Sequence, residues 1–373
     1  MPKFLEIKAT PKEYLDRMAF TWHKDGDGEY VVRDKLLIVS EEEAQAYIDA
    51  SNELYEMYEA GAAYVVEHEL FEALDIPPSL VDAIKESWRS ERGNHLYGRF
   101  DLSGGIDAQP IKLIEFNADT PTLLLETSLI QWMLQEYNGL SARQFNNIYN
   151  AIGLKAQSIA QSKKGAFSKM LFSSISGVSE EIATTKLLAS MARDRGLLCE
   201  FAYLEDVAFR EGVVLDGEER EYDFWFKLYP WEEMEEFEGV LHTSVLNPAY
   251  TLLYQSKGML AILSELFPDS PYLLNASFEP LKEKYVKKRM FGREGANIDI
   301  VEQGRIVDTT DGIYGEYASV YQEYAEFVRD EKGRYYQAGV FYSDGACGLG
   351  FRRGAQILDD MSQFVGHIIQ DER

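Results

Sequence analysis

Two short segments of this chain, 96–102 and 111–117, alternate apolar and polar residues and are separated by Gly104-Gly105. Such alternation predicts β-strands, and a pair of glycines between two strands predicts a tight reversal of the chain. Strands that follow one another in sequence are usually neighbours in space. We therefore expect the two segments to pair, which constrains everything that packs around them.

Four polar side chains on these strands are candidates for a site. Side chains two residues apart in a strand lie on the same face, so Arg99 shares a face with Asp101, and Glu115 shares one with Asn117. If the strands pair, all four converge. Carboxylate and amide oxygens suit Mg²⁺, which takes one or two carboxylates and otherwise binds phosphates. A strand pair with solvated charges would show the same spacing, so both interpretations stay open.

The rest of the chain changes repeatedly between helical and strand periodicity. The first predicted helix has Ser40 and Glu43 placed as a capping box. Helices are predicted over 40–75, 79–92, 120–137, 141–161 and 180–193. Further strands are predicted over 171–175, 225–229, 285–290, 296–302, 320–324, 335–342 and 346–351. A strand at 171–175 followed by a helix at 180–193 is typical of an open α/β sheet, so the fold class is predicted to be mixed α/β.

Composition excludes several classes of protein. The chain has 373 residues, with 37 Lys plus Arg against 63 Asp plus Glu, a net charge of −26. Such an acidic chain is not expected to bind nucleic acid. We see no signal-peptide pattern and no apolar run near the ~18 residues of a membrane span, so no membrane partner is expected. The two cysteines, Cys199 and Cys347, fit a reducing compartment. These features favour a cytoplasmic enzyme.

A second group of residues has the chemistry of a phosphate site. Segment 287–297, KKRMFGREGAN, runs from a strand that carries Lys288 into a glycine-rich turn. Lysine binds phosphate as a point charge, and glycines let backbone N–H groups approach phosphate oxygens. Lys257 begins an apolar helix, where a cation opposes the helix dipole unless an anion lies nearby. Because neither the Walker nor the Rossmann glycine pattern is present, a basic hairpin is an equal alternative.

The other signals are weaker. Segment 320–324, VYQEY, could hydrogen-bond an adenine edge through its backbone, and Arg352 lies at the end of a late glycine-rich strand. The five histidines show no spacing typical of metal ligands, and no nucleophile motif such as GxSxG is present. Hydrolysis by a serine or cysteine nucleophile therefore has no support.

Taken in chain order, these motifs resemble the synthetase domain of the glutathionylspermidine synthase family. The matching segments cover roughly 15–370 and are RFD (99–101), EFNADTPT (115–122), FKLYPWE (226–232), SKG (256–258), KxxxGREGAN (288–297) and YQEY (321–324). The family's separate amidase domain has no room in this chain. We therefore expect a stand-alone member of the type called acid–amine ligases.

The resemblance implies an ATP-grasp fold with a pre-ATP-grasp domain. Within one synthetase-like unit, 1–373, three parts are expected. The first, about 15–165, holds the N-terminal helices and the RFD/EFNAD strand pair. The second, about 166–255, is the pre-ATP-grasp-like α/β part. The third, about 256–373, is the ATP-grasp nucleotide-binding part.

Carried over position by position, the resemblance also implies roles for single residues. The implied Mg²⁺ ligands are Asp101, Glu115 and Asn117, and the implied catalytic residues are Arg99 and Arg352, which would neutralise charge on the transferring phosphoryl group. The implied ATP-binding residues are Lys257, Lys288, Gly292, Arg293, Glu294, Gly295, Gln322, Glu323 and Tyr324. Thr120 and Thr122 would meet the acid substrate, and Glu180 and Glu181 a cationic amine. The sequence departs from the family at Arg289, where the family usually has Pro, and at Arg353, where it usually has Glu.

The function implied is that of an ATP- and Mg²⁺-dependent carboxylate–amine ligase. ATP would phosphorylate a carboxylate, and an amine would attack the acyl phosphate to form an amide. Its partners would be a small-molecule acid and a small-molecule amine, and nothing in the sequence fixes an oligomeric state. Two alternatives remain, namely a nucleotide-binding sensor or partner protein without turnover, and a peptide or amino-acid ligase that uses neither glutathione nor spermidine.

Overall fold

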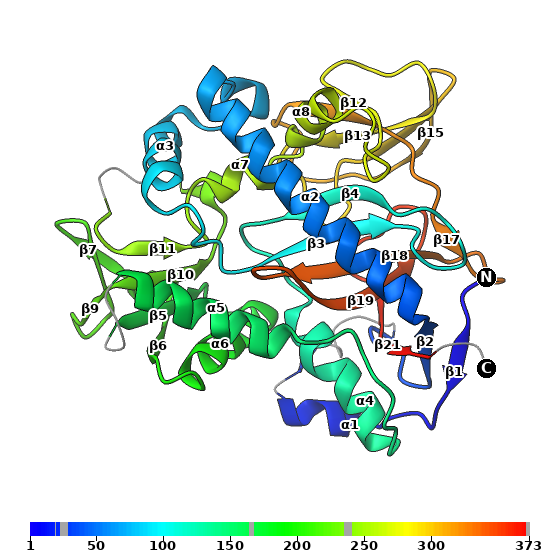
Figure 1. Ribbon diagram of the computed structural model, residues 1–373, viewed down its shortest axis with the longest axis horizontal. Coiled ribbons are helices and arrows are strands. Elements are labelled where there is room, and N and C mark those ends of the chain that lie inside the picture. Colours follow the sequence, from blue (N-terminus) through cyan, green and yellow to red (C-terminus); the bar gives the residue numbers. More distant parts are fainter. Residues whose placement is uncertain (19, 23–28, 164–167, 235–240, 371–373) are drawn as a thin grey trace.

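The computed structural model describes residues 1–18, 20–22, 29–163, 168–234 and 241–370, and its mixed α/β character confirms the predicted fold class. In this part of the chain the strands form five sheets. A six-stranded antiparallel sheet lies in the middle of the molecule, between a four-stranded parallel sheet and a five-stranded antiparallel sheet (Figure 1).

The central sheet has the order β20–β19–β18–β3–β4, with β17 beside β18. Its strands are β3 (Gly98–Ser103), β4 (Lys112–Asn117), β17 (Val328–Arg329), β18 (Tyr335–Tyr342), β19 (Ala346–Gly354) and β20 (Gln363–Val365). The predicted pairing is confirmed, because β3 and β4 are antiparallel with Asp101 opposite Glu115 and Arg99 opposite Asn117. Gly105 has a positive φ of 82°, and a Cβ atom there would lie 2.3 Å from the ring of Tyr47, so only glycine fits.

One long helix, α2 (Glu41–His68), crosses the face of the central sheet (Figure 1). The predicted capping box is present, since Ser40 accepts from the Glu43 amide and Glu43 accepts from the Ser40 amide. The prediction that the helix reaches residue 75 is wrong, because Glu69 adopts the left-handed conformation and ends it. Tyr58 of the helix packs edge-on against Phe100 and Phe116, whose rings stack 3.9 Å apart.

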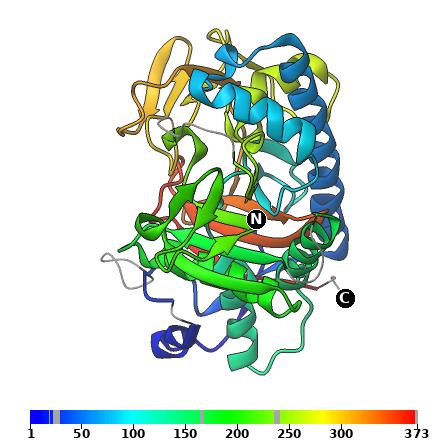
Figure 2. The ribbon, with the colours of Figure 1, turned by 90° about the vertical axis from the view of Figure 1, so that its left-hand side faces the viewer.

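The parallel sheet has the order β11–β10–β5–β6 and confirms the predicted βα unit (Figure 2). Its strands are β5 (Lys169–Ser174), β6 (Leu198–Tyr203), β10 (Phe224–Leu228) and β11 (Ser244–Leu246). Helix α6 (Ser179–Arg193) packs on β5 and β6, and α5 (Ile148–Lys163) packs on α6. A small antiparallel sheet extends from this region and contains β7 (Ala208–Arg210), β8 (Val213–Leu215) and β9 (Glu221–Tyr222).

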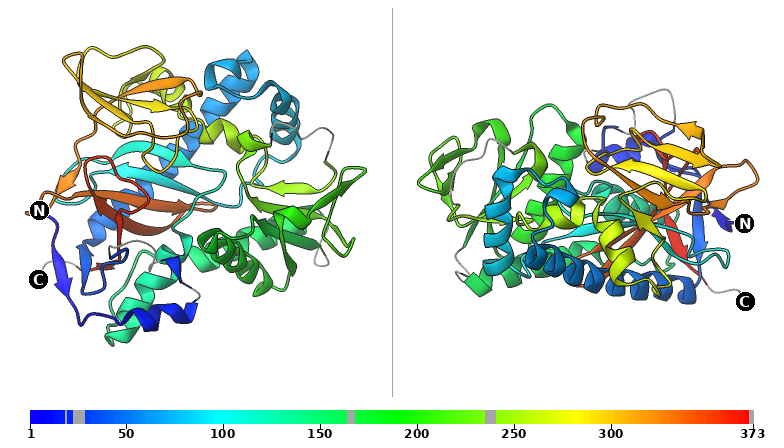
Figure 3. Two further views of the ribbon diagram at one scale, coloured as in Figure 1. Left: turned by 180° about the vertical axis from the view of Figure 1, so that it is seen from behind. Right: turned by 90° about the horizontal axis from the view of Figure 1, so that it is seen from above.

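The five-stranded sheet lies above the central sheet when the molecule is seen from behind (Figure 3). In order, its strands are β12 (Ala276–Ser277), β16 (Ser319–Glu323), β13 (Tyr285–Arg289), β14 (Asp299–Glu302) and β15 (Arg305–Thr309). Helix α8 (Met259–Leu266) packs against β12 and β16, and α7 (Thr251–Gln255) precedes it. The strand predicted at 296–302 begins only at Asp299, because the residues before it form a loop.

The remaining elements are short. The first and last strands form a sheet of their own, in the order β1 (Phe4–Glu6), β2 (Lys35–Val39) and β21 (His367–Ile369). The other helices are α1 (Lys12–Leu15), α3 (Val81–Ser90) and α4 (Gln131–Tyr137), the last preceded by a π-helical turn, Glu126–Ile130. Short 3₁₀ turns cover Asp16–Met18, Glu72–Leu74, Pro78–Leu80, Leu204–Asp206 and Trp231–Glu233.

Two predicted helices begin later than expected. The prediction of a helix from Thr120-Pro121 is wrong, because Leu123 has a positive φ of 65° and the helical turns start after it. Thr120 and Thr122 consequently lie in a loop. The helix predicted from residue 141 begins at Ile148, because Arg143 and Asn146 instead form β-bridges with Ile369 and Gly348.

The central sheet draws its strands from two distant stretches, 98–117 and 328–365. The division into parts at about residues 165 and 255 stays a prediction. In the described ranges, none of the helices is both long enough and apolar enough to span a bilayer.

A buried ion pair joins the central sheet to the parallel sheet. The Nζ atom of Lys227, on β10, lies 3.2 Å from Oδ1 of Asp119, which follows β4, and both side chains are fully buried. Asp119 also accepts from the Trp231 amide at 2.8 Å, and Lys227 donates to the Tyr229 carbonyl at 2.7 Å. Burial raises the pKa of Asp119 and lowers that of Lys227, while the two charges oppose these shifts.

Replacement of Lys227 by Met should therefore leave Asp119 buried without its cation. We expect the free energy of unfolding to fall by about 3–5 kcal/mol, measured by urea denaturation. Lys282→Met removes a charge from an exposed position and is the control, with an expected change below about 0.5 kcal/mol. Equal effects of the two substitutions would contradict a structural role for the pair.

Candidate active site

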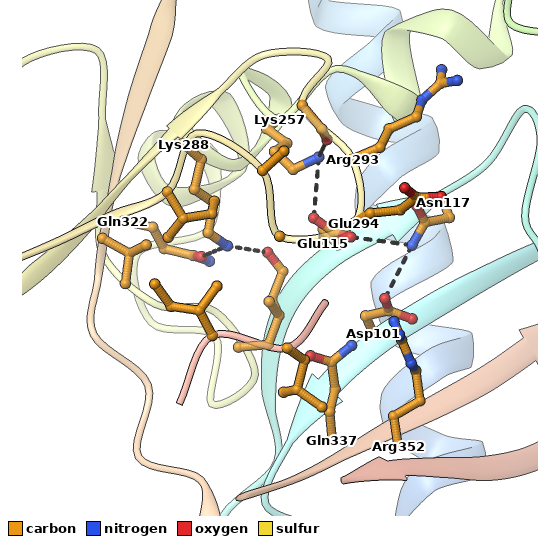
Figure 4. A pocket seen from close by; sticks show the side chains of 18 of the residues that line it. Asp101, Glu115, Asn117, Lys257, Lys288, Arg293, Glu294, Gln322, Gln337 and Arg352 are labelled. Carbon is orange, nitrogen blue, oxygen red and sulfur yellow. Dashed lines mark hydrogen bonds and ion pairs between the residues drawn. The ribbon is translucent and has the colours of Figure 1, made fainter. Parts of the chain in front are cut away.

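A cavity of about 350 Å³ lies between the central and five-stranded sheets. Its wall is built from β3, β4, β13, β16 and β19 and from the loops around residues 292–296 and 356–358 (Figure 4). This volume falls in the range of small-molecule sites. All the predicted site residues except Glu180 line this one cavity.

The carboxylate end of the cavity is the β3–β4 pair. Arg99 binds Asp101 through two hydrogen bonds of 2.6 and 2.9 Å and donates to the Thr122 carbonyl at 2.8 Å. The Asn117 amide bridges the two carboxylates, with Nδ2 3.2 Å from Asp101 and 3.4 Å from Glu115. Figure 4 shows this row of three side chains along β3 and β4. The predicted cation ligands therefore converge in space.

The two predicted phosphate lysines lie beside this row. Lys257 Nζ is 3.1 Å from Glu115 Oε2 and donates to the Gly292 carbonyl at 2.6 Å. Lys288 Nζ donates to Gln322 Oε1 at 2.7 Å and to the Ile114 carbonyl at 2.9 Å. Burial raises the pKa of Glu115, but the lysine charges outweigh it and hold that pKa at about 2. Burial lowers the pKa of Lys288 to about 8, against the attraction of Glu115.

Residues 292–295, hereafter the glycine loop, cover one side of the cavity. Gly295 has a φ of +70°, and a Cβ atom there would lie 2.2 Å from the Leu358 carbonyl oxygen. A side chain is therefore excluded where the loop meets residue 358. Arg293 forms an ion pair with Glu232, on the turn after β10. Its guanidinium points away from Glu115 and Lys257 (Figure 4).

The opposite end of the cavity is mainly apolar. Its lining includes Ile114, Val286, Ile300, Ala325 and Phe327, next to the predicted adenine segment Gln322, Glu323 and Tyr324. The amides of Glu323 and Tyr324 already donate to the carbonyls of Asn275 and Lys284, at 2.7 and 3.1 Å. Those two N–H groups are therefore not available to a base. Gln322 is held by Lys288 and by the Leu113 carbonyl, so its side chain orients the lysine.

The predicted substrate residues lie on the remaining sides. Thr120, Thr122 and Glu181 line the cavity, whereas Glu180, at the start of α6, does not. Burial raises the pKa of Glu180 to about 8 and that of Glu181 to about 7. Nearby carboxyl groups add to both shifts, and Arg352 and Arg293 respectively oppose them. Among the described residues, Glu181 Oε2 and Arg352 Nε are buried without a hydrogen-bond partner.

Some lining residues carry no signal in the sequence. Gln337 lies opposite Arg352 in the β18–β19 register, and Gln356 donates to the Tyr324 hydroxyl at 2.7 Å. A single glutamine in a strand or loop resembles any surface residue, so only its position in the fold reveals it. Glu232 does not line the cavity but binds Arg293, which does. It belongs to the FKLYPWE motif, but the pattern assigns it no role.

The donor set fits a hard cation better than a soft one. Within the ranges that the structure describes, no three His, Cys, Asp or Glu residues are grouped to hold a metal by themselves. Two carboxylates and one amide are the partial set that suits Mg²⁺, whose remaining ligands are water and phosphate. The two arginines that depart from the family lie outside the cavity: Arg289 bonds the Tyr317 carbonyl and Arg353 bonds Gln363.

Comparisons with known proteins place the chain among ligases that form amide bonds. The chain matches the family described as "Glutathionylspermidine synthase preATP-grasp" over residues 3–370. It is 30% identical to the "Putative acid–amine ligase" of Haemophilus influenzae, with 86% of each chain covered. It is 27% identical to the bifunctional glutathionylspermidine synthetase/amidase of Escherichia coli, covering 86% of this chain but 56% of that protein.

More distant relatives also match most of this chain. The trypanothione synthetase of Crithidia fasciculata is 24% identical, with 80% of this chain and 51% of that protein covered. Among solved structures, a glutathione synthetase-like effector of Globodera pallida superposes with a TM-score of 0.59 at 11% identity, covering 90% and 89% of the two chains. The family match and the superposition confirm the predicted ATP-grasp type of fold. The curated relatives confirm the predicted enzyme class, a carboxylate–amine ligase. The chain belongs to the glutathionylspermidine synthase preATP-grasp family.

Proposed function

We propose that this protein joins a small-molecule carboxylate to a small-molecule amine at the expense of ATP, by way of an acyl phosphate. The observation that carries the proposal is the meeting of three groups in one cavity. They are the carboxylate and amide row of β3 and β4, the lysines Lys257 and Lys288, and the glycine loop. Binding a nucleotide without turnover would require fewer buried charges than this.

ATP would lie with its base toward the apolar end and its phosphates between Lys257, Lys288 and the glycine loop. Asp101, Glu115 and Asn117 would hold Mg²⁺, which would supply charge neutralisation at the phosphates. For this, the Asn117 amide must present Oδ1 in place of the Nδ2 that now bridges the carboxylates. A half-turn about the last side-chain bond is sufficient, because the two amide atoms are nearly equal in size.

The reaction divides into two transfers. A carboxylate oxygen of the acid attacks the γ-phosphorus, the bond to the bridging oxygen breaks, and ADP leaves. The amine nitrogen then attacks the acyl carbon, phosphate leaves, and the nitrogen gives up a proton. Arg99 is fixed by its two bonds to Asp101, and Arg352 has a buried Nε free of protein partners, so both can stabilise charge on the transferred group.

Lys257, Lys288 and the glycine loop, which would contact the ATP phosphates, mark the phosphate end of the cavity. Substrate selection would depend on the other groups around this phosphate end. Thr120 and Thr122 offer hydroxyl groups to the acid, and Glu181 offers a carboxyl group to a cationic amine, whereas Glu180 lies outside the cavity wall. The raised pKa of Glu181 fits this role, because a cation that enters the site favours the charged carboxylate and lowers the pKa again. The net charge of −26 would also raise the local concentration of cationic amines.

The test is ADP release by the purified protein with ATP and Mg²⁺ against a matrix of acids and amines. The matrix includes glutathione, single amino acids, dipeptides and spermidine. We expect one acid and one amine to stimulate ADP release together, with the amide detected by mass spectrometry. Binding of ATP without stimulation by any pair would favour the nucleotide-binding alternative, and a pair without glutathione or spermidine would favour the peptide or amino-acid ligase.

Lys288 and Glu115, two of the charged groups at the phosphate end, should be needed for turnover. Lys288→Ala and Glu115→Ala should each lower ATP turnover by at least about tenfold, since each removes a charge contact in the transition state. Lys287→Ala is the matched control, because Lys287 adjoins Lys288 on β13 but does not line the cavity. Wild-type rates in the Lys288 and Glu115 variants would contradict the assignment.

The charge on Lys288 should also shape the pH dependence. Its pKa of about 8 means that the ammonium form, which binds phosphate, is lost as the pH rises above that value. We expect kcat/KM for ATP to fall about tenfold per pH unit above this pKa, measured up to about pH 9.5. Lys288→Arg keeps its charge throughout and should lack that step. Identical profiles for the two proteins would show that another group titrates.

A further inference from the structure

The ion pair between Glu232 and Arg293 links the turn after the parallel sheet to a loop of the five-stranded sheet. Glu232 lies on the turn Trp231–Glu233, directly after β10 of the parallel sheet. Arg293 belongs to the glycine loop, which connects β13 and β14 of the five-stranded sheet. The Glu232 side chain is only 2% exposed, whereas that of Arg293 is 25% exposed. A buried carboxylate beside the parallel sheet thus binds a loop of the five-stranded sheet.

The turn that carries Glu232 is itself firmly placed. The Trp231 amide donates to Asp119 at 2.8 Å, and the Trp231 indole donates to the Asn247 carbonyl at 3.0 Å. Lys227 lies 4.2 Å from the centre of the Trp231 ring and pairs with Asp119. Asp119, Lys227, Glu232 and Arg293 consequently form a row of alternating charge that begins next to β4 and ends on the glycine loop.

The charges in this row depend on one another. Burial raises the pKa of Glu232, and Asp119 adds to this shift, whereas Arg293 and Lys227 oppose it. The second carboxylate oxygen, Oε2, has no hydrogen-bond partner among the described residues. Arg293 is therefore the cation that makes a buried charge at Glu232 tolerable, and the loop that carries Arg293 is drawn to that carboxylate.

The direction of the Arg293 side chain shows what the pair does. Its guanidinium is turned away from Glu115 and Lys257, so it does not add to the cations there (Figure 4). The backbone of the same loop instead faces the cavity, with the Gly292 carbonyl bound by Lys257 and Gly295 against residue 358. The side chain of Arg293 thus binds outside the cavity wall, while the backbone of its loop forms part of that wall.

We propose that Glu232 is a positioning residue: by binding Arg293, it holds the glycine loop over the phosphate end of the cavity. The proposal rests on the proposed function for the identity of the phosphates, but not for the contact itself. Its consequence is that loss of the Glu232 charge loosens the loop and weakens nucleotide binding, although Glu232 does not line the cavity.

The test compares Glu232→Gln with Glu233→Gln, its exposed neighbour on the same turn. Hydrogen exchange of the backbone amides of residues 291–297, without ligand, reports on the loop itself. We expect exchange there to be about tenfold faster in Glu232→Gln and unchanged in Glu233→Gln. The KM for ATP and the Kd for ADP should rise by a similar factor in Glu232→Gln, with a smaller change in kcat. Unchanged exchange in Glu232→Gln would overturn the proposal.

A second pair of variants tests the contact from the other side. Arg293→Gln should speed loop exchange as Glu232→Gln does, and Arg293→Lys should restore most of the protection. The double variant Glu232→Gln/Arg293→Gln should be no worse than either single one, because both remove the same interaction. Additive effects would overturn the proposal. If Glu232→Gln does not fold, the Arg293 variants, changed at a more exposed side chain, decide the question.

These measurements are separable from the search for substrates. If no acid and amine stimulate ADP release, the proposed ligase activity fails, and loop exchange still shows whether Glu232 holds the loop. If a ligase activity is found but Glu232→Gln behaves as Glu233→Gln does, only the positioning role fails.

Discussion

Because β3 and β4 pair with Asp101 opposite Glu115, two carboxylates are fixed side by side at the wall of the cavity. Two neighbouring carboxylates repel each other unless cations lie close to them. Arg99 supplies one cation, which donates two hydrogen bonds to Asp101, and Lys257 supplies another beside Glu115. Arg99 lies on β3 with Asp101, whereas Lys257 lies in the segment before α8. The register of β3 and β4 therefore requires that the segment before α8 pack beside this strand pair.

The need for cations beside these carboxylates also explains how an acidic chain can offer a site for an anion. The chain as a whole carries a net charge of −26, a field that repels phosphate. Lys257, Lys288 and Arg352 are nevertheless gathered on one cavity, and the two lysines are held by named protein partners. Cations that are held in place before a ligand arrives need little reorganisation when it binds. The fold therefore creates a local group of positive charges in a chain whose overall charge is negative.

Many elements of the fold could be predicted because their signals are local. Alternation of residues indicates β3 and β4, and the capping box indicates where α2 begins. The failures occur at single residues: Leu123, in a left-handed conformation, delays the helix expected at Thr120, and Glu69 ends α2 early. Neither residue type announces a positive φ. Both conformations depend on surrounding contacts that a window of sequence does not contain.

The sequence alone determined the chemical inventory of the site and its grouping into motifs. The motifs RFD, EFNADTPT and GREGAN contain its carboxylates, several of its cations and its loop, because side chains close in sequence share a strand or a turn. Only the tertiary structure decided which of these groups meet. It placed Lys288 beside Gln322, left Glu180 outside the cavity wall, and joined Arg293 to Glu232 across 61 residues. Such contacts depend on how three sheets pack, and packing is set by buried surfaces distributed over the whole chain.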